Sequence, residues 1–227
     1  MKKESHVLVI FPHPDDEAFG VSGTIAMHTS KGTPVTYACL TLGEMGRNLG
    51  NPPFATRESL PLIRKEELKK AAEAIGITDL RMMGLRDKTL EFEDDDEMVD
   101  LVTDLINDTN PSLIISFYPG YSVHPDHEAT ARAVVRAVKK LPTEQRPTLH
   151  CVAFSNGHEE HIGKADVVYS IEPFAEQKMA AMKAHISQTA WMLKDLEDTL
   201  KHGDKEEATV KFFTEQFWTY DVDKSDL

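Results

Sequence analysis

The chain has 227 residues, 41% of them hydrophobic, so it can bury the core of a single domain spanning residues 1–227. Its net charge of -13 argues against nucleic acid or an anionic membrane as a partner and favours a small-molecule substrate. No apolar run approaches the ~20 residues of a membrane helix, and no signal-peptide region precedes the first strand, so we expect a cytoplasmic protein. Cys39 and Cys151 each lie in an apolar run and are expected to be buried small side chains rather than a disulfide or zinc ligands.

The first expected strand, Val7–Phe11, ends at the stretch His13-Pro14-Asp15-Asp16-Glu17. Ligands of open α/β sheets bind beyond the carboxyl ends of strands, and imidazoles and carboxylates are good ligands for a divalent ion such as zinc. His13 and Asp16 are three residues apart, so a tight turn can direct both to one ion and leave Asp15 free to handle protons. The alternative is an ordinary polar loop in which one of the aspartates caps the following helix.

The second expected strand, residues 35–41, leads into a long loop rich in glycine and proline, residues 43–53. Loops of this length are often functional, and this one should overhang the same edge of the sheet. Glu44 and Arg47 in this loop are candidates for substrate contacts, although a solvated surface is an equal alternative for Arg47.

A helix is expected from near Pro61 to Ile75. Arg64 in its first turns could reach the rim of the pocket or pair with a neighbouring glutamate, and spacing alone favours the pair. A short strand at residues 80–83 then brings Asp87 towards the same rim.

The acidic run over residues 91–97 is expected to be a solvated loop before a helix at residues 98–106, since it lacks the ligand order of a calcium loop. The strand at residues 113–117 is followed by His124-Pro125-Asp126-His127 and a strong helical pattern from Glu128. This second turn occupies a place equivalent to the first. Together the turns offer two or three histidines and one or two carboxylates to one ion, whereas two unrelated helix caps would need a double coincidence.

A strand at residues 149–154 precedes His158 and His161, a rival pair that we expect not to bind metal because no aspartate accompanies it. His185 is expected to be a satisfied helix-end histidine rather than a pocket residue. The remaining elements are expected to be a last strand and three helices, at residues 167–171, 173–184, 190–200 and 208–217. Strands alternating with helices predict an α/β fold, a Rossmann-like three-layer sandwich with a mostly parallel, doubly wound sheet. The absence of G-x-G-x-x-G after the first strand argues against a nucleotide-binding protein.

The two histidine-bearing turns resemble the paired motifs of the LmbE-like, or PIG-L, family of zinc-dependent N-acetylglucosaminyl deacetylases. The similarity covers nearly the whole chain. It extends to three further segments: Thr41-Leu42-Gly43-Glu44, Arg64-Lys65-Glu66-Glu67, and Lys178 with His185-Ile186-Ser187-Gln188.

The resemblance implies that Asp15 is the general base and that His124 is a second catalytic histidine. Asp126 would cap its helix, the favoured role, or orient a histidine of its own turn. The implied ligands of Zn2+, or of ferrous iron or another divalent ion, are His13, Asp16 and His127.

The chain looks most like bacterial enzymes that deacetylate N-acetylglucosaminyl-malate in bacillithiol biosynthesis. The resemblance gives Arg64 a substrate-binding role in place of the pairing expected from spacing, and Tyr121 or Tyr118 matches the family's carbonyl-polarising tyrosine. The expected substrate-binding residues are Arg64, Glu44, Arg47, Asp87 and Tyr121. The alternatives are an amidase of thiol S-conjugates, a deacetylase of another N-acetyl sugar and, more remotely, a non-catalytic sugar- or metal-binding module. Members of the family are often homo-oligomers, so a trimer or hexamer is expected.

Overall fold

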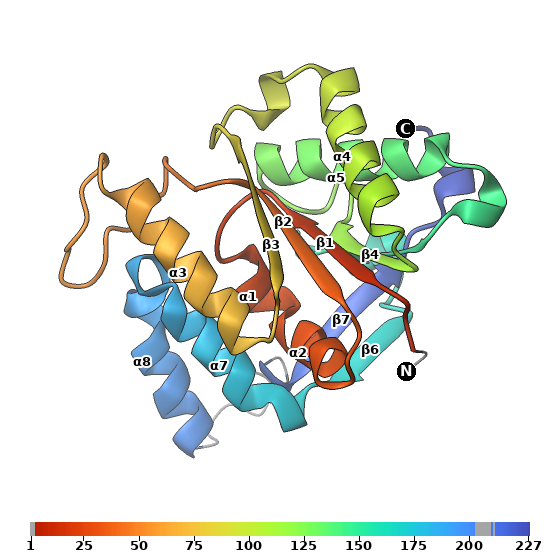
Figure 1. Cartoon of the computed structure of the whole chain (residues 1–227). Coiled ribbons are helices and arrows are strands. Elements are labelled where there is room, and N and C mark those ends of the chain that lie inside the picture. The colour runs from red at the N-terminus through yellow and green to blue at the C-terminus, as the bar shows by residue number, and fades with distance from the viewer. Residues whose placement is uncertain (1–2, 203–209, 211) are drawn as a thin grey trace.

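The computed structural model of the chain describes residues 3–202, 210 and 212–227. Within them, strands form one seven-stranded sheet in the order β3-β2-β1-β4-β5-β7-β6 (Figure 1). The first five strands pair in parallel, and β7 runs antiparallel to both of its neighbours. The strands are β1 (Val7–Phe11), β2 (Val35–Thr41), β3 (Asp79–Leu85), β4 (Leu113–Phe117), β5 (Thr148–Val152), β6 (Val167–Ser170) and β7 (Thr214–Thr219). The mostly parallel α/β sheet predicted from the sequence is confirmed.

Helices cover both faces of the sheet and complete three layers (Figure 1). One face carries α1 (Asp16–Gly20), α2 (Ser22–Ser30), α3 (Leu60–Ala74), α7 (Ala175–Ala184) and α8 (Ile186–His202). The other carries α4 (Asp95–Thr109) and α5 (Pro125–Lys140). The short helix α6 (His158–Ile162) follows β5. None of the described helices is both long and apolar enough to cross a bilayer.

The central strand β1 shows why the sequence adopts this arrangement. All five of its side chains are buried, and they alternate between the two helical layers. Val7, Val9 and Phe11 pack with the α2, α3 and α7 side, while Leu8 and Ile10 pack with α4 and α5. A continuous apolar run is what a strand covered on both faces requires. Cys39 and Cys151 are also buried in the sheet, and both are free thiols.

The end of the chain differs from the sequence-based expectation. The helix expected over residues 208–217 lies partly outside the described residues, and from Thr214 onward the chain is strand β7, not helix. The strand at residues 167–171 is therefore not the last one. Phe217 and Trp218 are buried because β7 is inserted between β5 and β6, which is a tertiary pairing that local sequence does not encode.

Candidate active site

The turns that follow β1 and β4 meet at one end of the sheet because these two strands are paired neighbours. His13 Nδ1 lies 3.2 Å from His127 Nε2, although the two residues are 114 positions apart. The Asp16 carboxylate joins both rings, with Oδ2 3.6 Å from His13 Nδ1 and Oδ1 3.3 Å from His127 Nε2. The fold thus brings the three predicted metal ligands together.

The spacing of these atoms fits a divalent ion. Zinc binds nitrogen and oxygen ligands at roughly 2.0–2.2 Å, and a tetrahedral arrangement then separates ligand atoms by roughly 3.3–3.6 Å. Burial would raise the pKa of Asp16, but the His127 and His13 imidazoles hold it well below its usual range, so the carboxylate is ionised. One carboxylate and two imidazoles form a donor set that suits zinc or a similar ion.

Hydrogen bonds behind the two rings fix which nitrogen of each faces the site. The Nε2 atom of His13 lies 3.1 Å from Asp126 Oδ2 and 3.2 Å from Asp87 Oδ1. The Nδ1 atom of His127 lies 3.0 Å from the carbonyl oxygen of Ser122. Such acceptors orient metal-binding histidines and set their tautomer. Burial lowers the pKa of His13, but hydrogen bonds to Asp126, Asp16 and Asp87 outweigh it and raise the pKa well above its ordinary value.

The position of Asp126 corrects the sequence-based expectation. This residue is fully buried, and its carboxylate accepts hydrogen bonds from Lys88 N at 2.7 Å and Leu90 N at 3.2 Å as well as facing His13. The cap of α5 is His124, whose Nδ1 accepts from Asp126 N at 3.2 Å. Asp126 therefore neither caps the helix nor orients a histidine of its own turn; it supports the histidine of the other turn.

A second group of possible ligands lies on the far side of His13. His13 Nε2, Asp87 and Asp126 are close enough to surround a cation. Three of the four carboxylate oxygens already accept backbone hydrogen bonds, because Asp126 accepts the two N–H groups described above and Asp87 Oδ2 accepts from Met45 N at 2.7 Å. The side of His13 that faces Asp16 and His127 is therefore the better metal site.

His124 presents a hydrogen-bond donor to the same region. Its ring centre lies 4.9 Å from that of His13 and 5.1 Å from that of His127. Burial, with the two neighbouring imidazoles, lowers the pKa of His124 and favours the neutral ring. Because Nδ1 accepts the helix-capping hydrogen bond, the neutral ring carries its hydrogen on Nε2.

Asp15, next to the candidate ligand Asp16, has an unusual backbone conformation. Its φ of 102° is positive, and its N–H donates to Glu17 Oε2 at 3.1 Å. Residues in such sparsely populated regions are common at functional sites. Burial raises the pKa of Asp15 to about 6, although Arg64 opposes the rise. A carboxylate that titrates near neutral pH suits a general base.

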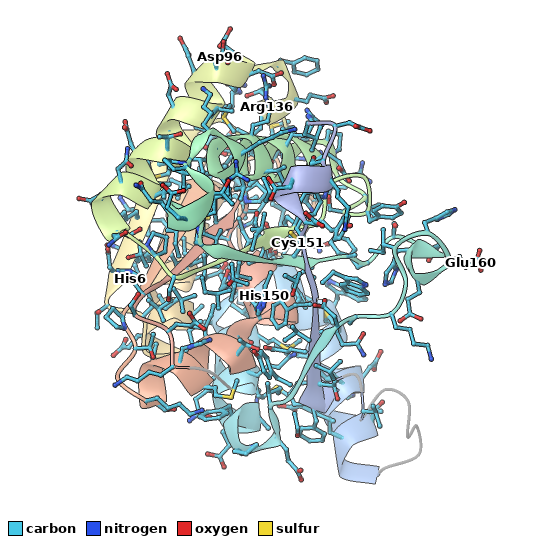
Figure 2. All side chains as sticks on the ribbon, turned by 90° about the vertical axis from the view of Figure 1, so that its right-hand side faces the viewer. His6, Asp96, Arg136, His150, Cys151 and Glu160 are labelled. Carbon is cyan, nitrogen blue, oxygen red and sulfur yellow. The ribbon has the colours of Figure 1, made fainter. Side chains whose placement is uncertain are left out.

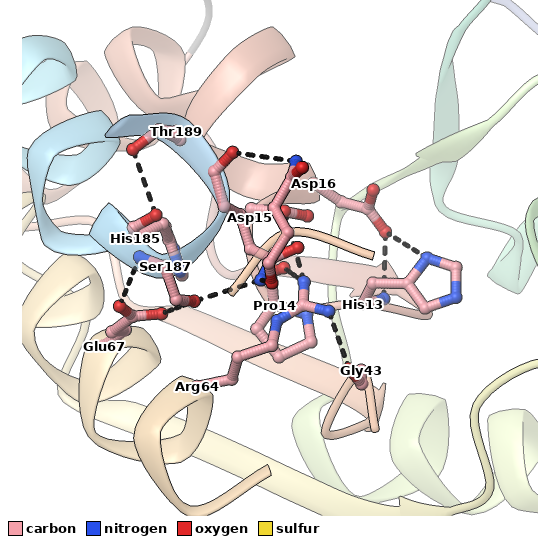
Figure 3. Close-up of polar contacts among 12 residues, drawn as sticks. His13, Pro14, Asp15, Asp16, Gly43, Arg64, Glu67, His185, Ser187 and Thr189 are labelled. Carbon is pink, nitrogen blue, oxygen red and sulfur yellow. Dashed lines mark hydrogen bonds and ion pairs between the residues drawn. The ribbon is translucent and has the colours of Figure 1, made fainter. Parts of the chain in front are cut away.

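Arg64 lies beneath the turn and fixes it (Figure 3). The residue is 3% exposed. Its guanidinium donates to the carbonyl oxygens of Pro14 and Gly43, and Nη2 lies 3.2 Å from Asp15 Oδ2. Gly43 has a φ of +63°, and a Cβ there would overlap the guanidinium. Arg64 therefore pairs with Asp15. Spacing alone had predicted a pair with a glutamate of its own helix, and that prediction is wrong.

Further buried contacts support Glu17 behind the turn. Its Oε1 lies 2.5 Å from His185 Nε2, and its Oε2 accepts from Tyr37 Oη at 3.1 Å as well as from Asp15 N. Burial lowers the pKa of His185, but Glu17 outweighs it and raises the pKa above its ordinary value. His185 is fully buried, so it supports the turn from below rather than lining the pocket.

A polar cavity of about 480 Å³ opens above these groups, lined by residues of both turns and by Arg64 and Asp87. Arg47 and Lys88 also line it, and the ion pairs among the described residues include neither. Glu44 is not among the residues that line it, and its Oε2 accepts from Asp87 N at 3.2 Å.

Tyr121 does not line this cavity. Its ring packs on Tyr118, with centres 5.6 Å apart, and its carbonyl oxygen accepts from the amides of Phe154 and Ser155. The substrate contact expected for Tyr121, like that for Glu44, has no support in this arrangement.

The rival pair His158 and His161 lies on α6, on the projecting segment that carries the labelled Glu160 in Figure 2. His158 packs edge-on against Trp218, and His161 lies against Tyr121. Within the described part of the chain, the clusters able to surround an ion include neither.

Known proteins with related sequences place the chain in a family. The profile of the PIG-L family, described as GlcNAc-PI de-N-acetylase, matches residues 8–138. A Bacillus subtilis (strain 168) protein named "Probable N-acetyl-alpha-D-glucosaminyl L-malate deacetylase 2" is 54% identical over 217 residues, which are 96% of this chain and 98% of that protein. The chain belongs to the PIG-L family.

Solved structures agree with this fold. The N,N'-diacetylchitobiose deacetylase from Pyrococcus horikoshii gives a TM-score of 0.70 at 23% identity, with 96% of this chain and 85% of that chain covered. The 4-carboxy-2-hydroxymuconate hydratase GalB from Pseudomonas putida KT2440 gives 0.71 at 19% identity, with 96% of both chains covered. These similarities establish the fold alone. Since the two proteins are named for different reactions, the chemistry of this PIG-L protein has to be argued from its own side chains.

Sequence reasoning missed Lys88 as a cavity residue. Lysine rarely adopts a positive φ, yet Lys88 has a φ of 65° because its N–H donates to the buried Asp126 carboxylate. The nearby Gly84-Leu85-Arg86-Asp87 segment was the available signal, since it placed this loop at the rim.

Proposed function

We propose that this PIG-L protein is a zinc-dependent hydrolase that removes the N-acetyl group from a glucosaminyl conjugate, with N-acetylglucosaminyl-malate as its substrate. One observation carries the proposal. Two adjacent aspartates have different partners: Asp16 faces the paired imidazoles of His13 and His127, whereas Asp15 pairs with Arg64. A binding module needs only the first arrangement, whereas a hydrolase also needs a nearby carboxylate that can act as a base, and Asp15 meets this need.

The residues divide the reaction among them. When bound by His13, Asp16 and His127, zinc would supply a Lewis acid for the acetyl carbonyl and lower the pKa of water to roughly 7. Asp15 accepts the proton of the attacking water, and His124 Nε2–H donates to the carbonyl oxygen as negative charge develops there. The carbon–nitrogen bond then breaks, and the proton held by Asp15 passes to the leaving nitrogen. The products are acetate and a free amine.

The cations of the polar cavity support an anionic conjugate as substrate. Arg47 and Lys88 have no carboxylate partner among the described residues, in a chain with a net charge of -13. Malate carries two carboxylates, and a conjugate seated in this cavity would bring them to free cations. In this arrangement Arg64 positions Asp15 and the turn, while Arg47 and Lys88 contact the substrate.

Release of free amine from synthetic N-acetylglucosaminyl-malate by the zinc-loaded protein tests the proposal. The wild type should release one amine per substrate, and Asp15→Asn should lose about two or more orders of magnitude in turnover while it retains zinc. A panel that includes other N-acetyl sugars and thiol S-conjugate amides separates the alternative substrates. The absence of amine release from every member of the panel would refute an amide hydrolase.

A further inference from the structure

An apolar pocket of about 470 Å³ adjoins the polar cavity at the two histidine-bearing turns. Three residues line both spaces: Asp15, Asp16 and His127. The remaining walls of the pocket are apolar or glycine, from Phe11, Phe19, Gly20, Val21, Phe117, Val152 and Phe154. The proposed base and metal ligands therefore stand at the boundary between a charged compartment and an apolar one.

The apolar wall is built directly onto a metal-binding ring. Phe117 stacks on His127, with ring centres 4.1 Å apart and planes 16° apart, and Phe154 packs against both rings. Phe19 and Phe154 remain 40% and 47% exposed, although each borders the pocket. Large aromatic side chains left exposed beside a concave site are typical of ligand-binding surfaces.

The two compartments match the two halves of an amide. A sugar conjugate with carboxylates belongs in the cavity that holds Arg47 and Lys88, so the acyl half faces the apolar pocket. A methyl group occupies about as much space as a water molecule, roughly 30 Å³. The pocket therefore exceeds the needs of an acetyl group by an order of magnitude.

We propose that this pocket binds aliphatic acyl chains, so that the protein hydrolyses N-butyryl and N-hexanoyl glucosaminyl conjugates as well as N-acetyl ones. The inference rests on the proposed deacetylase function and extends its substrate class. The step balances as before: water adds across the carbon–nitrogen bond, and the products are a carboxylate and the same amine. Each buried methylene can improve binding by up to about fourfold, which offsets the cost of ordering a longer chain.

The test compares kcat/KM of the zinc-loaded full chain for N-acetyl, N-butyryl and N-hexanoyl glucosaminyl-malate. The inference expects the longer amides to be cleaved with at least about one-tenth of the N-acetyl kcat/KM. A value below that for either longer amide would overturn it and leave the deacetylase proposal intact. No cleavage of any of the three would instead refute the deacetylase proposal.

Two variants that narrow the pocket test whether the acyl chain of the substrate lies in it. Val152 and Gly20 both line the pocket. A Cβ at Gly20 would stand 3.6 Å from Val152 Cγ1, which is an ordinary contact, and Gly20 has no positive φ, so a side chain there is not strained. Val152→Phe and Gly20→Leu should each lower the ratio of hexanoyl to acetyl kcat/KM by about tenfold or more. Val168→Phe is the matched control, since Val168 is exposed on β6 outside the pocket, and it should leave the ratio unchanged. An unchanged ratio in both pocket variants would overturn the assignment.

Discussion

Replacement of Gly43 by alanine tests whether Arg64 holds the active-site turn. Gly43 has a φ of +63°, and an added Cβ would overlap the Arg64 guanidinium. Positive φ costs an alanine about 1–2 kcal/mol. Displacement of the guanidinium also breaks the 2.9 Å hydrogen bond from Arg64 Nη1 to Gly43 O, and a hydrogen bond to a charged group is worth about 1.5–3 kcal/mol. Gly43→Ala should therefore lower the free energy of unfolding by about 2.5–5 kcal/mol.

Gly32→Ala isolates the backbone contribution. Gly32 has a φ of +72°, but nothing lies within 4 Å of the position a Cβ would take. This control should lose only about 1–2 kcal/mol in guanidinium-induced unfolding. Equal losses of unfolding free energy in the two variants would refute the contact between Gly43 and Arg64.

Activity adds a second measurement to the same pair of variants. Without Arg64 beside it, Asp15 loses its orientation, so kcat should fall by roughly tenfold to a hundredfold in Gly43→Ala. Arg64 also lowers the pKa of Asp15, so its displacement raises that pKa, and the acidic limb of the kcat profile should move to higher pH. Wild-type kcat with an unmoved pH profile would show that Arg64 does not position the base.

Three further predictions concern other residues. Asp126→Asn should weaken zinc binding by roughly 10–100-fold because His13 loses its charged partner, whereas the surface variant Asp96→Asn should keep the wild-type affinity. Equal zinc affinities of the two variants, measured in competition with a chelator, would contradict this. Lys88→Met should raise KM for N-acetylglucosaminyl-malate by roughly fivefold, which corresponds to about 1 kcal/mol, and leave KM for N-acetylglucosamine unchanged. Equal effects on the two KM values would show that Lys88 does not bind the malate carboxylates. Burial lowers the pKa of His28 from 6.5 to about 4, so the unfolded chain binds more protons between these values and stability falls as pH drops through them. Between pH 7 and pH 5 the wild type should lose about 2 kcal/mol of unfolding free energy that His28→Leu does not lose, and parallel stability curves would contradict the shift.

The sequence predicted the sheet and the meeting of the two turns for a physical reason. Polar residues at the ends of parallel strands collect at one edge, and β1 and β4 proved to be neighbours. The same pattern could not predict which nitrogen of His13 faces the site. That choice depends on Asp126, a residue 113 positions away. Asp126 stands at a helix start, where a capping role is the ordinary expectation.

Other differences arise from contacts that no local pattern contains. Spacing alone predicted that Arg64 pairs within its own helix, and the family resemblance predicted a contact with substrate, but the space above Gly43 lets it reach Asp15. The positive φ of Lys88 is a consequence of the buried carboxylate that binds its amide. Strand β7 has a short, partly polar sequence, and only its place between two other strands makes it a strand. The homo-oligomer expected from the family resemblance stays a prediction, which sedimentation of the purified protein would test.

Anomalous diffraction at the zinc edge, from crystals of the zinc-loaded protein, tests the central claim most directly. We expect one peak at roughly 2.0–2.2 Å from His13 Nδ1, His127 Nε2 and an Asp16 oxygen, with the Asp15 carboxylate beyond coordination distance. A peak on the opposite side of His13, between Asp87 and Asp126, or coordination by Asp15, would contradict it.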